Sequence, residues 1–157
     1  MIEGELDRFS WSYFNLRGED KVIAFTPTFT FATPGNLSNV YTVQIGYGVA
    51  IGNVFWFTMR LAWTPTHTNA SGEARFAGFP FNALDVTDLT DTFALRNTGV
   101  NLDWGAGITM LAGGIAGGQN YVRLIGSGSG VASATLDTAA FPTGQAQTLQ
   151  MSGAYLI

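Results

Sequence analysis

The chain has 157 residues and a formal net charge of −4, with seven lysines and arginines against eleven aspartates and glutamates. Nucleic-acid-binding domains present basic surfaces and anionic membranes attract basic segments, so this charge balance argues against both partners. The chain has no cysteine, which excludes disulfides, thiolate metal sites and a cysteine nucleophile. Membrane insertion is not expected, because no apolar run is long enough to span a bilayer.

Low charge is the second feature of the composition. Charged residues make up 11% of the chain and hydrophobic residues 46%, whereas soluble domains average about 25% charged residues. Part of the surface is therefore expected to be buried against a copy of the chain or another partner. The length suits one domain that needs no metal or disulfide to fold, and the sequence gives no indication of a cofactor.

Residues 1–24 differ from the rest of the chain. They hold eight of its 18 formal charges beside four aromatic residues, Phe9, Trp11, Tyr13 and Phe14. The first fourteen residues are acidic and polar, so no signal peptide is expected there. We expect residues 1–24 to be a linker or to contact a neighbouring chain, and residues 25–157 to form the domain.

Apolar residues recur with period two from residue 25 onward, which is typical of strands. The first predicted strand covers 25–33 and the second 41–51, where we expect the odd-numbered residues to face inward and a bend at the glycines. Gly52 and Asn53 then supply a tight hairpin turn. The inward set of the second strand is Tyr41, Val43, Ile45, Tyr47, Val49 and Ile51.

The third predicted strand, 54–64, has two contrasting faces. Its inward face is predicted to carry Phe55, Phe57, Met59, Leu61 and Trp63, and its other face Trp56, Thr58, Arg60 and Ala62.

Six further strands are predicted, separated by turn residues. One of them, 100–110, is expected to turn Met110 inward and Asn101 and Asp103 outward. Gly113-Gly114 and the glycine–serine stretch 126–130 are expected to form turns. Nine strands without crossover helices predict an antiparallel β-sandwich of about eight or nine strands. The remaining five strands are 73–77, 92–96, 120–125, 132–136 and 148–157.

No catalytic or metal site stands out. A glycosidase needs two carboxylates about 5–9.5 Å apart, but most candidates here fall in predicted turns, where aspartate accepts backbone hydrogen bonds. Residues 85–91 hold three aspartates without the oxygen spacing and glycine of a known calcium loop. His67 is the only histidine, so an ordinary zinc site is not expected. These candidates are Glu73, Asp85, Asp88, Asp91, Asp103 and Asp137.

Trp56 is the most informative polar-face residue. A tryptophan beside hydrogen-bonding groups such as Thr58 and Arg60 is a common way to hold a sugar ring. The alternative is that Trp56 is buried in a subunit interface or beneath a loop, and we favour burial. The candidate ligand contacts on the surface are Trp56, Arg60, His67, Asn101 and Asp103.

With the strand order established, several motifs resemble the C-terminal domain of bacteriophage tail fibres and tailspikes. They follow one another in the order of that family and together cover about residues 25–157. The family has a Thr-Arg pair where Val49 and Ala50 stand here, so no role of that arginine is carried over. The motifs are Phe25-Thr-Pro-Thr-Phe-Thr-Phe31, Tyr41-Thr-Val-Gln-Ile-Gly-Tyr47, Ile51-Gly-Asn-Val-Phe-Trp-Phe57, Ser71-Gly-Glu-Ala-Arg-Phe-Ala-Gly-Phe-Pro-Phe81 and Met151-Ser-Gly-Ala-Tyr155.

This resemblance implies a jelly-roll-like sandwich that forms a homotrimer with other fibre or tail components of a virion. Such a domain is made in the bacterial cytoplasm and acts outside the cell, where it binds a host surface glycan or envelope protein or caps the trimer. It is not an enzyme, since the family keeps catalysis in a separate β-helix. Two alternatives stay open: a free-standing carbohydrate-binding module or lectin, and a polysaccharide depolymerase.

Overall fold

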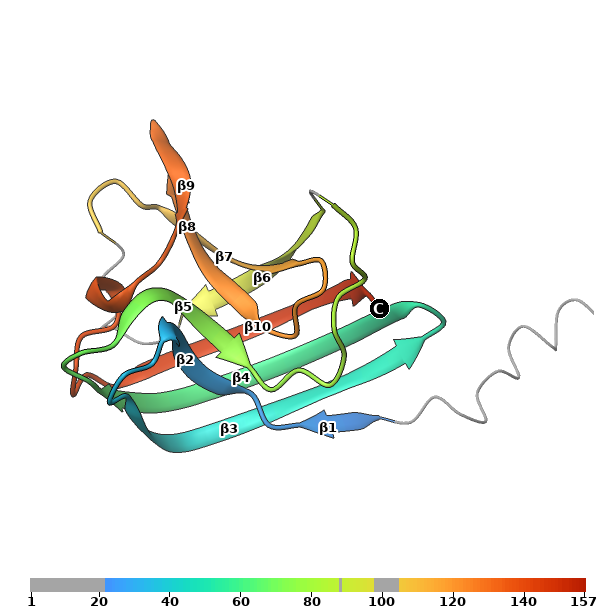
Figure 1. Ribbon diagram of the computed structural model, residues 1–157, viewed down its shortest axis with the longest axis horizontal. Helices are drawn as coiled ribbons and strands as arrows, with labels where there is room; N and C mark the ends of the chain where they lie inside the picture. Colours follow the sequence, from blue (N-terminus) through green and yellow to red (C-terminus); the bar gives the residue numbers. More distant parts are fainter. Residues whose placement is uncertain (1–21, 88, 98–104) are drawn as a thin grey trace, which may run out of the picture.

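The computed structural model describes residues 22–87, 89–97 and 105–157 (Figure 1). Within them, the chain forms ten strands and one 3-10 helix, and no helix is long and apolar enough to cross a lipid bilayer. The elements are β1 (Ile23–Phe25), β2 (Thr28–Thr33), β3 (Ser38–Ile51), β4 (Val54–Thr66), β5 (Ser71–Ala77), β6 (Thr90–Asn97), β7 (Met110–Ala116), β8 (Val122–Gly128), β9 (Val131–Thr135), η2 (Thr138–Ala140) and β10 (Gln147–Leu156).

All ten strands belong to one antiparallel sheet. Its order is β1-β3-β4-β10-β6-β7-β8-β5-β2, with β9 paired to β8. β1 and β2 stand at opposite ends of this order, yet only Thr26 and Pro27 separate them in the chain. The sheet therefore curls into a half-barrel until its ends approach each other (Figure 1). The predicted all-β antiparallel fold is confirmed, with ten strands among the described residues where nine were predicted. The predicted strand 25–33 is divided at Thr26 and Pro27, and β7 begins where the predicted strand 100–110 ends.

Side chains of β3 bridge the place where the two ends of the sheet meet. The Asn39 Nδ2 donates to the Phe29 carbonyl at 2.9 Å, and the Gln44 Nε2 donates to the Pro27 carbonyl at 3.1 Å. Tyr41 adds a third contact to the backbone of β2. These bonds satisfy main-chain groups of Phe29, on the outer edge of β2, and of Pro27, just before that strand.

Aromatic rings fill the inside of the curl. The inward residues of β4 predicted from the sequence are all buried, Phe55 through Trp63 at alternate positions. The ring of Phe57 meets that of Phe93 edge-on at 5.0 Å, and Trp63 lies 4.8 Å from Phe29. The edge-on contact adds to the free energy gained by burying the rings themselves. β10 contributes Leu149, Met151 and Tyr155, at alternate positions, to the same core.

The expectation for β3 was wrong over most of its length. A register shift between Tyr41 and Val43 in its pairing with β4 reverses the side-chain alternation. Because strand periodicity is two, one extra residue moves every later side chain to the opposite face. Tyr41 faces inward, but Ile45, Tyr47 and Ile51 are 47%, 49% and 55% exposed. The bend was expected at the glycines, and it lies at Thr42 instead.

Glycines explain why the reversed alternation is favourable. Gly46 and Gly48 occupy the inward positions of β3, where a Cβ on Gly46 would lie 2.6 Å from the Phe25 ring. A Cβ on Gly48 would meet the Phe55 ring and lie 2.6 Å from the Trp56 carbonyl oxygen. Large rings from neighbouring strands thus take the volume that side chains of β3 would fill.

The region after residue 97 also differs from the expectation. Residues 100–104 of the predicted strand 100–110 lie outside the described residues, and a turn precedes β7. Met110 starts β7 and is exposed, not inward. Gly113 and Gly114 were expected in a turn but lie inside β7, where a Cβ on Gly113 would collide with Met151 and Val122. Because glycine has no side chain, core residues occupy the space beside Gly113 and Gly114, and the strand continues through both.

Candidate functional site on the outer face of the sheet

The outer face of β3, β4 and β10 carries three rows of side chains set by strand register. Val49, Trp56 and Ala154 form the first row, and Tyr47, Thr58 and Ser152 form the second. Neighbouring strands lie about 4.8 Å apart, and successive rows about 6.6–6.8 Å apart. The Thr58 and Ser152 hydroxyls hydrogen-bond to each other at 3.0 Å.

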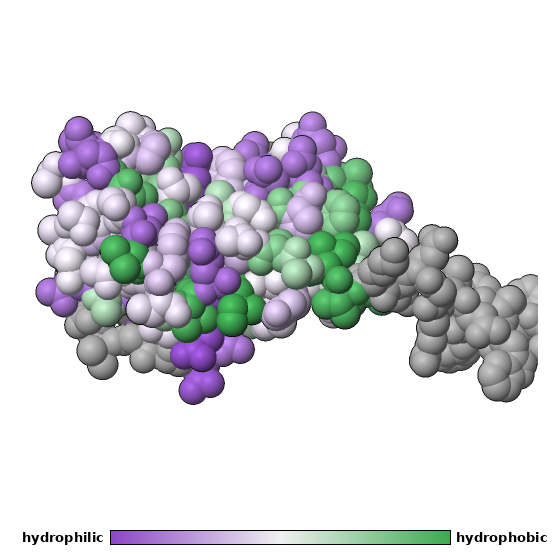
Figure 2. Space-filling model, turned by 90° about the horizontal axis from the view of Figure 1, so that it is seen from below, coloured by the Kyte–Doolittle hydropathy of each residue, from purple (hydrophilic) through white to green (hydrophobic). Residues whose placement is uncertain are grey.

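Except for Ala154, the residues of the first two rows line an open groove of about 550 Å³. Its wall is mostly apolar, and residues from β3, β4 and β10 contribute together with the residue before β1. Figure 2 shows hydrophobic residues gathered on this side of the molecule, most closely toward the end where β1 begins. We call this surface the outer-face groove; the residues that matter below are Val22, Tyr47, Val49, Trp56, Thr58 and Ser152.

Trp56 lies at the centre of the groove and is 58% exposed. The sequence placed it on the polar face of its strand, and its neighbours Thr58 and Arg60 share that face as expected. The expectation that Trp56 is buried beneath a loop does not hold for the single chain in the described residues. Burial against a second chain stays a prediction.

A third row adds positive charge beside the groove. Arg60 lies opposite Ile45 on one side and Gln150 on the other, and Gln150 in turn lies opposite Arg96 of β6. Among the described residues, neither Arg60 nor Arg96 forms an ion pair, whereas Arg75 and Arg123 both do. The outer face therefore combines exposed aromatic rings with two arginines that pair with no described carboxylate.

His67 lies far from this face. It follows the end of β4, so about ten strand residues, or roughly 33 Å, separate it from Trp56. Its Nε2 lies 2.9 Å from the Phe141 carbonyl oxygen, and its ring meets that of Phe31 edge-on. Because a carbonyl only accepts, Nε2 carries the proton in this contact. This hydrogen bond connects the β4–β5 loop to the segment after η2.

Two of the predicted contacts, Asn101 and Asp103, lie outside the described residues. The structure thus brings together Trp56 and Arg60 but not His67. Sequence reasoning missed Tyr47, Ile45 and Arg96 as members of this surface. Tyr47 and Ile45 continue the alternation of Tyr41, so the sequence predicted that they face inward, and the bulge in β3 turns them outward. Arg96 lies in a predicted strand, but the sequence did not show which strands flank it.

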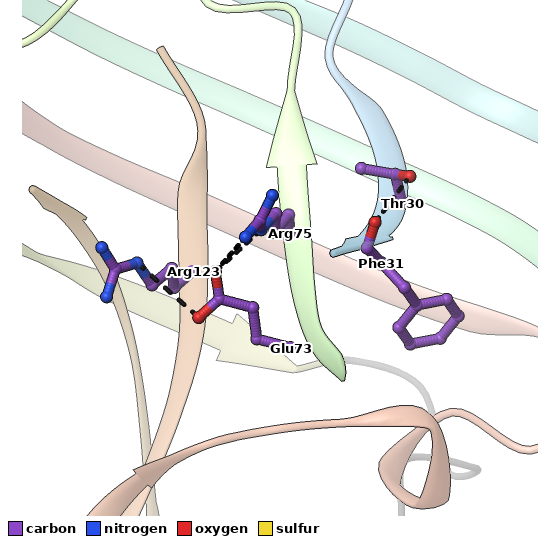
Figure 3. A network of polar contacts seen from close by, with 5 residues as sticks. All are labelled: Thr30, Phe31, Glu73, Arg75 and Arg123. Carbon is purple, nitrogen blue, oxygen red and sulfur yellow. Dashed lines mark hydrogen bonds and ion pairs between the residues drawn. The ribbon is translucent and has the colours of Figure 1, made fainter. Parts of the chain in front are cut away.

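Glu73 is held by two arginines on the opposite side of the molecule. The Arg75 Nη2 and Nε donate to one carboxylate oxygen at 2.5 and 2.8 Å, and Arg123 lies 3.7 Å from the other (Figure 3). The Arg75 guanidinium also stacks over the Tyr121 ring at 4.1 Å. Figure 3 shows the carboxylate between β5 and β8, with Thr30 and Phe31 of β2 bonded separately nearby. The cluster links β5 to β8.

The other candidate carboxylates that the structure describes lie at the start of a helix, within a strand and in a loop. Asp137 caps η2 by accepting from the Ala139 N–H at 2.9 Å, as short polar side chains commonly do at helix starts. Asp91 lies within β6 opposite Ile115, and Asp85 lies in the loop beside Gly118. Asp88 lies outside the described residues. In the described part of the chain, no three of His, Asp and Glu gather as metal ligands do.

Comparison with protein-family models, curated proteins and solved structures gave no match to this chain.

Proposed function

We propose that the chain is a non-enzymatic attachment or trimer-capping domain of a bacteriophage tail or head fibre. The motif order resembling that family supports this proposal, as does the all-β architecture. The jelly-roll-like sandwich, the homotrimer, the virion location and the host surface glycan or envelope protein as receptor are parts of the same proposal.

The observation that carries the proposal is the exposed outer face of β3, β4 and β10. It presents Ile45, Tyr47, Ile51 and Trp56 to solvent in a chain with few charges. Contiguous apolar surface of this kind marks sites where proteins associate. In a closed assembly of copies related by a rotation axis, each copy buries this surface against a neighbouring copy.

Binding to host cells tests the attachment role. Fluorescently labelled protein is expected to stain intact host bacteria, and unlabelled protein is expected to compete for the same sites. A panel of unrelated bacteria serves as the control. Staining of no strain, including the host of the virion, would contradict attachment and leave trimer capping as the function.

A free-standing carbohydrate-binding module is the second candidate. Trp56 and Tyr47 favour it, because exposed aromatic rings next to Thr58, Ser152 and Arg60 offer both stacking and hydrogen bonds to a sugar. This candidate predicts a monomer or dimer and saturable binding to a glycan array that is lost in Trp56→Ala. Thr143→Ala, which alters the distant His67 loop contact, is the matched control.

A further inference from the structure

The outer-face groove lies where the N-terminal segment enters the fold. Val22 lines the groove, and β1 begins with the next residue. Twenty-one residues precede Val22. An extended chain spans at most about 3.3–3.6 Å per residue, so the nine steps from Tyr13 to Val22 reach at most roughly 30 Å.

The N-terminal segment has the composition of a partner for this groove. Phe9, Trp11 and Tyr13 alternate with Ser10 and Ser12, so an extended segment would turn all three rings to one side. Aromatic rings of this kind bury large apolar areas in interfaces.

Charge adds a second match. Three acidic residues, Glu3, Glu5 and Asp7, occupy alternate positions before Phe9, and Arg8 lies between Asp7 and Phe9, on the opposite face of an extended segment. In an extended segment Asp7 stands about 6.6–6.8 Å from Phe9, the same as the spacing between the groove row at Thr58 and the row at Arg60. With Phe9 over Thr58, Asp7 therefore falls beside Arg60, whose guanidinium pairs with no described carboxylate.

Strand direction favours the groove of another copy. β1 runs antiparallel to β3, with Ile23 opposite Gly48, and it begins at the end of the molecule that carries the β3–β4 turn (Figure 1). A segment entering from that end must reverse its course to lie on its own outer face. A segment of a neighbouring copy needs no such reversal, and head-to-tail exchange around an axis closes into a ring.

We propose that residues 9–13 of one copy lie in the outer-face groove of the next, with Phe9, Trp11 and Tyr13 against Tyr47 and Trp56. This inference rests on the proposed trimer and names the contact that holds its copies together. Asp7 of the incoming segment then pairs with Arg60.

Cysteine pairs test the contact, because the native chain has no cysteine. Phe9→Cys combined with Thr58→Cys is expected to form a disulfide between different chains on mild oxidation, seen as covalent multimers on a non-reducing gel. Mixing the two single variants is expected to give a disulfide-linked pair. Ser10→Cys with Thr58→Cys is the matched control, expected to react at least about fivefold less because the Ser10 side chain points away from the groove.

The outcomes separate this inference from the proposed function. A disulfide within one chain would show that the segment covers its own groove, which overturns the inference. No disulfide in a protein that still sediments as a trimer would also overturn it and leave the trimer standing. A native chain that sediments as a monomer would overturn the trimer itself. Circular dichroism checks folding, and Ser152→Cys, across from Thr58, replaces Thr58→Cys if that variant misfolds.

Discussion

The hydroxyl of Tyr41 accepts a hydrogen bond of 2.9 Å from the backbone N–H of Phe29. Tyr41 belongs to β3 near one end of the sheet order and Phe29 to β2 at the other, so this bond joins the two ends of the curl. It satisfies a main-chain donor of a residue whose side chain is buried. Leaving such a donor unpaired costs about 1–3 kcal/mol.

Tyr41→Phe is therefore expected to lower the free energy of unfolding by about 1–3 kcal/mol. Urea unfolding followed by circular dichroism measures the change. Tyr47→Phe is the matched control, since Tyr47 belongs to the same strand but is exposed on the outer face. Equal stability of Tyr41→Phe and the native chain would show that the bond does not help close the sheet.

Gly48→Ala tests the close approach of strand and ring inside the curl. The added Cβ meets the Phe55 ring and the Trp56 carbonyl oxygen, which belongs to the backbone and yields little. Overpacking of this kind costs about 1–3 kcal/mol. Thr58→Ala changes an exposed residue on the opposite face and is expected to cost less than about 0.5 kcal/mol. A melting temperature unchanged by Gly48→Ala would contradict the packing described for β3.

Two tyrosines make stability fall at high pH. Burial raises the pKa of Tyr41 and of Tyr155, and the hydrogen bond that the Tyr41 hydroxyl accepts from Phe29 offsets only part of that effect. The Tyr155 hydroxyl donates to the Phe81 carbonyl at 2.9 Å. Their pKa values in the folded chain lie above the ordinary value of about 10, so the unfolded chain loses these protons first.

Stability is accordingly expected to be complete below about pH 10 and to decline above it by at most about 1.4 kcal/mol per pH unit for each tyrosine. Urea unfolding at a series of alkaline pH values measures the slope, and absorbance of the phenolate reports ionisation. Tyr155→Phe is expected to flatten the slope. Ionisation of every tyrosine before any unfolding would contradict the burial of these two hydroxyls.

Glu73→Gln separates a structural carboxylate from a catalytic one. Removing its charge weakens the contacts with Arg75 and Arg123, and a partly exposed cluster of this kind contributes about 1 kcal/mol. The expected result is that small loss of stability and unaltered staining of host cells. If native protein released sugars from host envelope polysaccharide and Glu73→Gln did not, the depolymerase alternative would replace our proposal.

The sequence predicted best where alternation is uninterrupted. The two faces of β4 and the buried residues of β10 follow directly from period two. It failed at β3 because a single bulge at Thr42 has no signature in hydrophobicity. It failed at Gly113 because a glycine that ends a strand and one that admits Met151 look alike in a sequence. Curling of one sheet depends on pairings between distant strands, which alternation does not specify.

The candidate surface was predictable only in part. Trp56 and Arg60 share a face of one strand, so their neighbourhood follows from spacing alone. Tyr47 and Arg96 join them through cross-strand register, which requires the sheet order β3-β4-β10-β6. The length of β4 separates His67 from Trp56 and Arg60. The sequence predicted that this strand ends at Thr64, two residues before the end of β4.

Self-association through the outer face is the central claim, and sedimentation equilibrium tests it most directly. The native 16.8 kDa chain is expected to sediment as three copies, about 50 kDa, at micromolar concentration. Trp56→Asp places a charge in the outer-face groove and is expected to give a monomer with an unchanged circular dichroism spectrum, while Val131→Asp, on the distant β9, stays trimeric. A native chain that sediments at 16.8 kDa would contradict the claim.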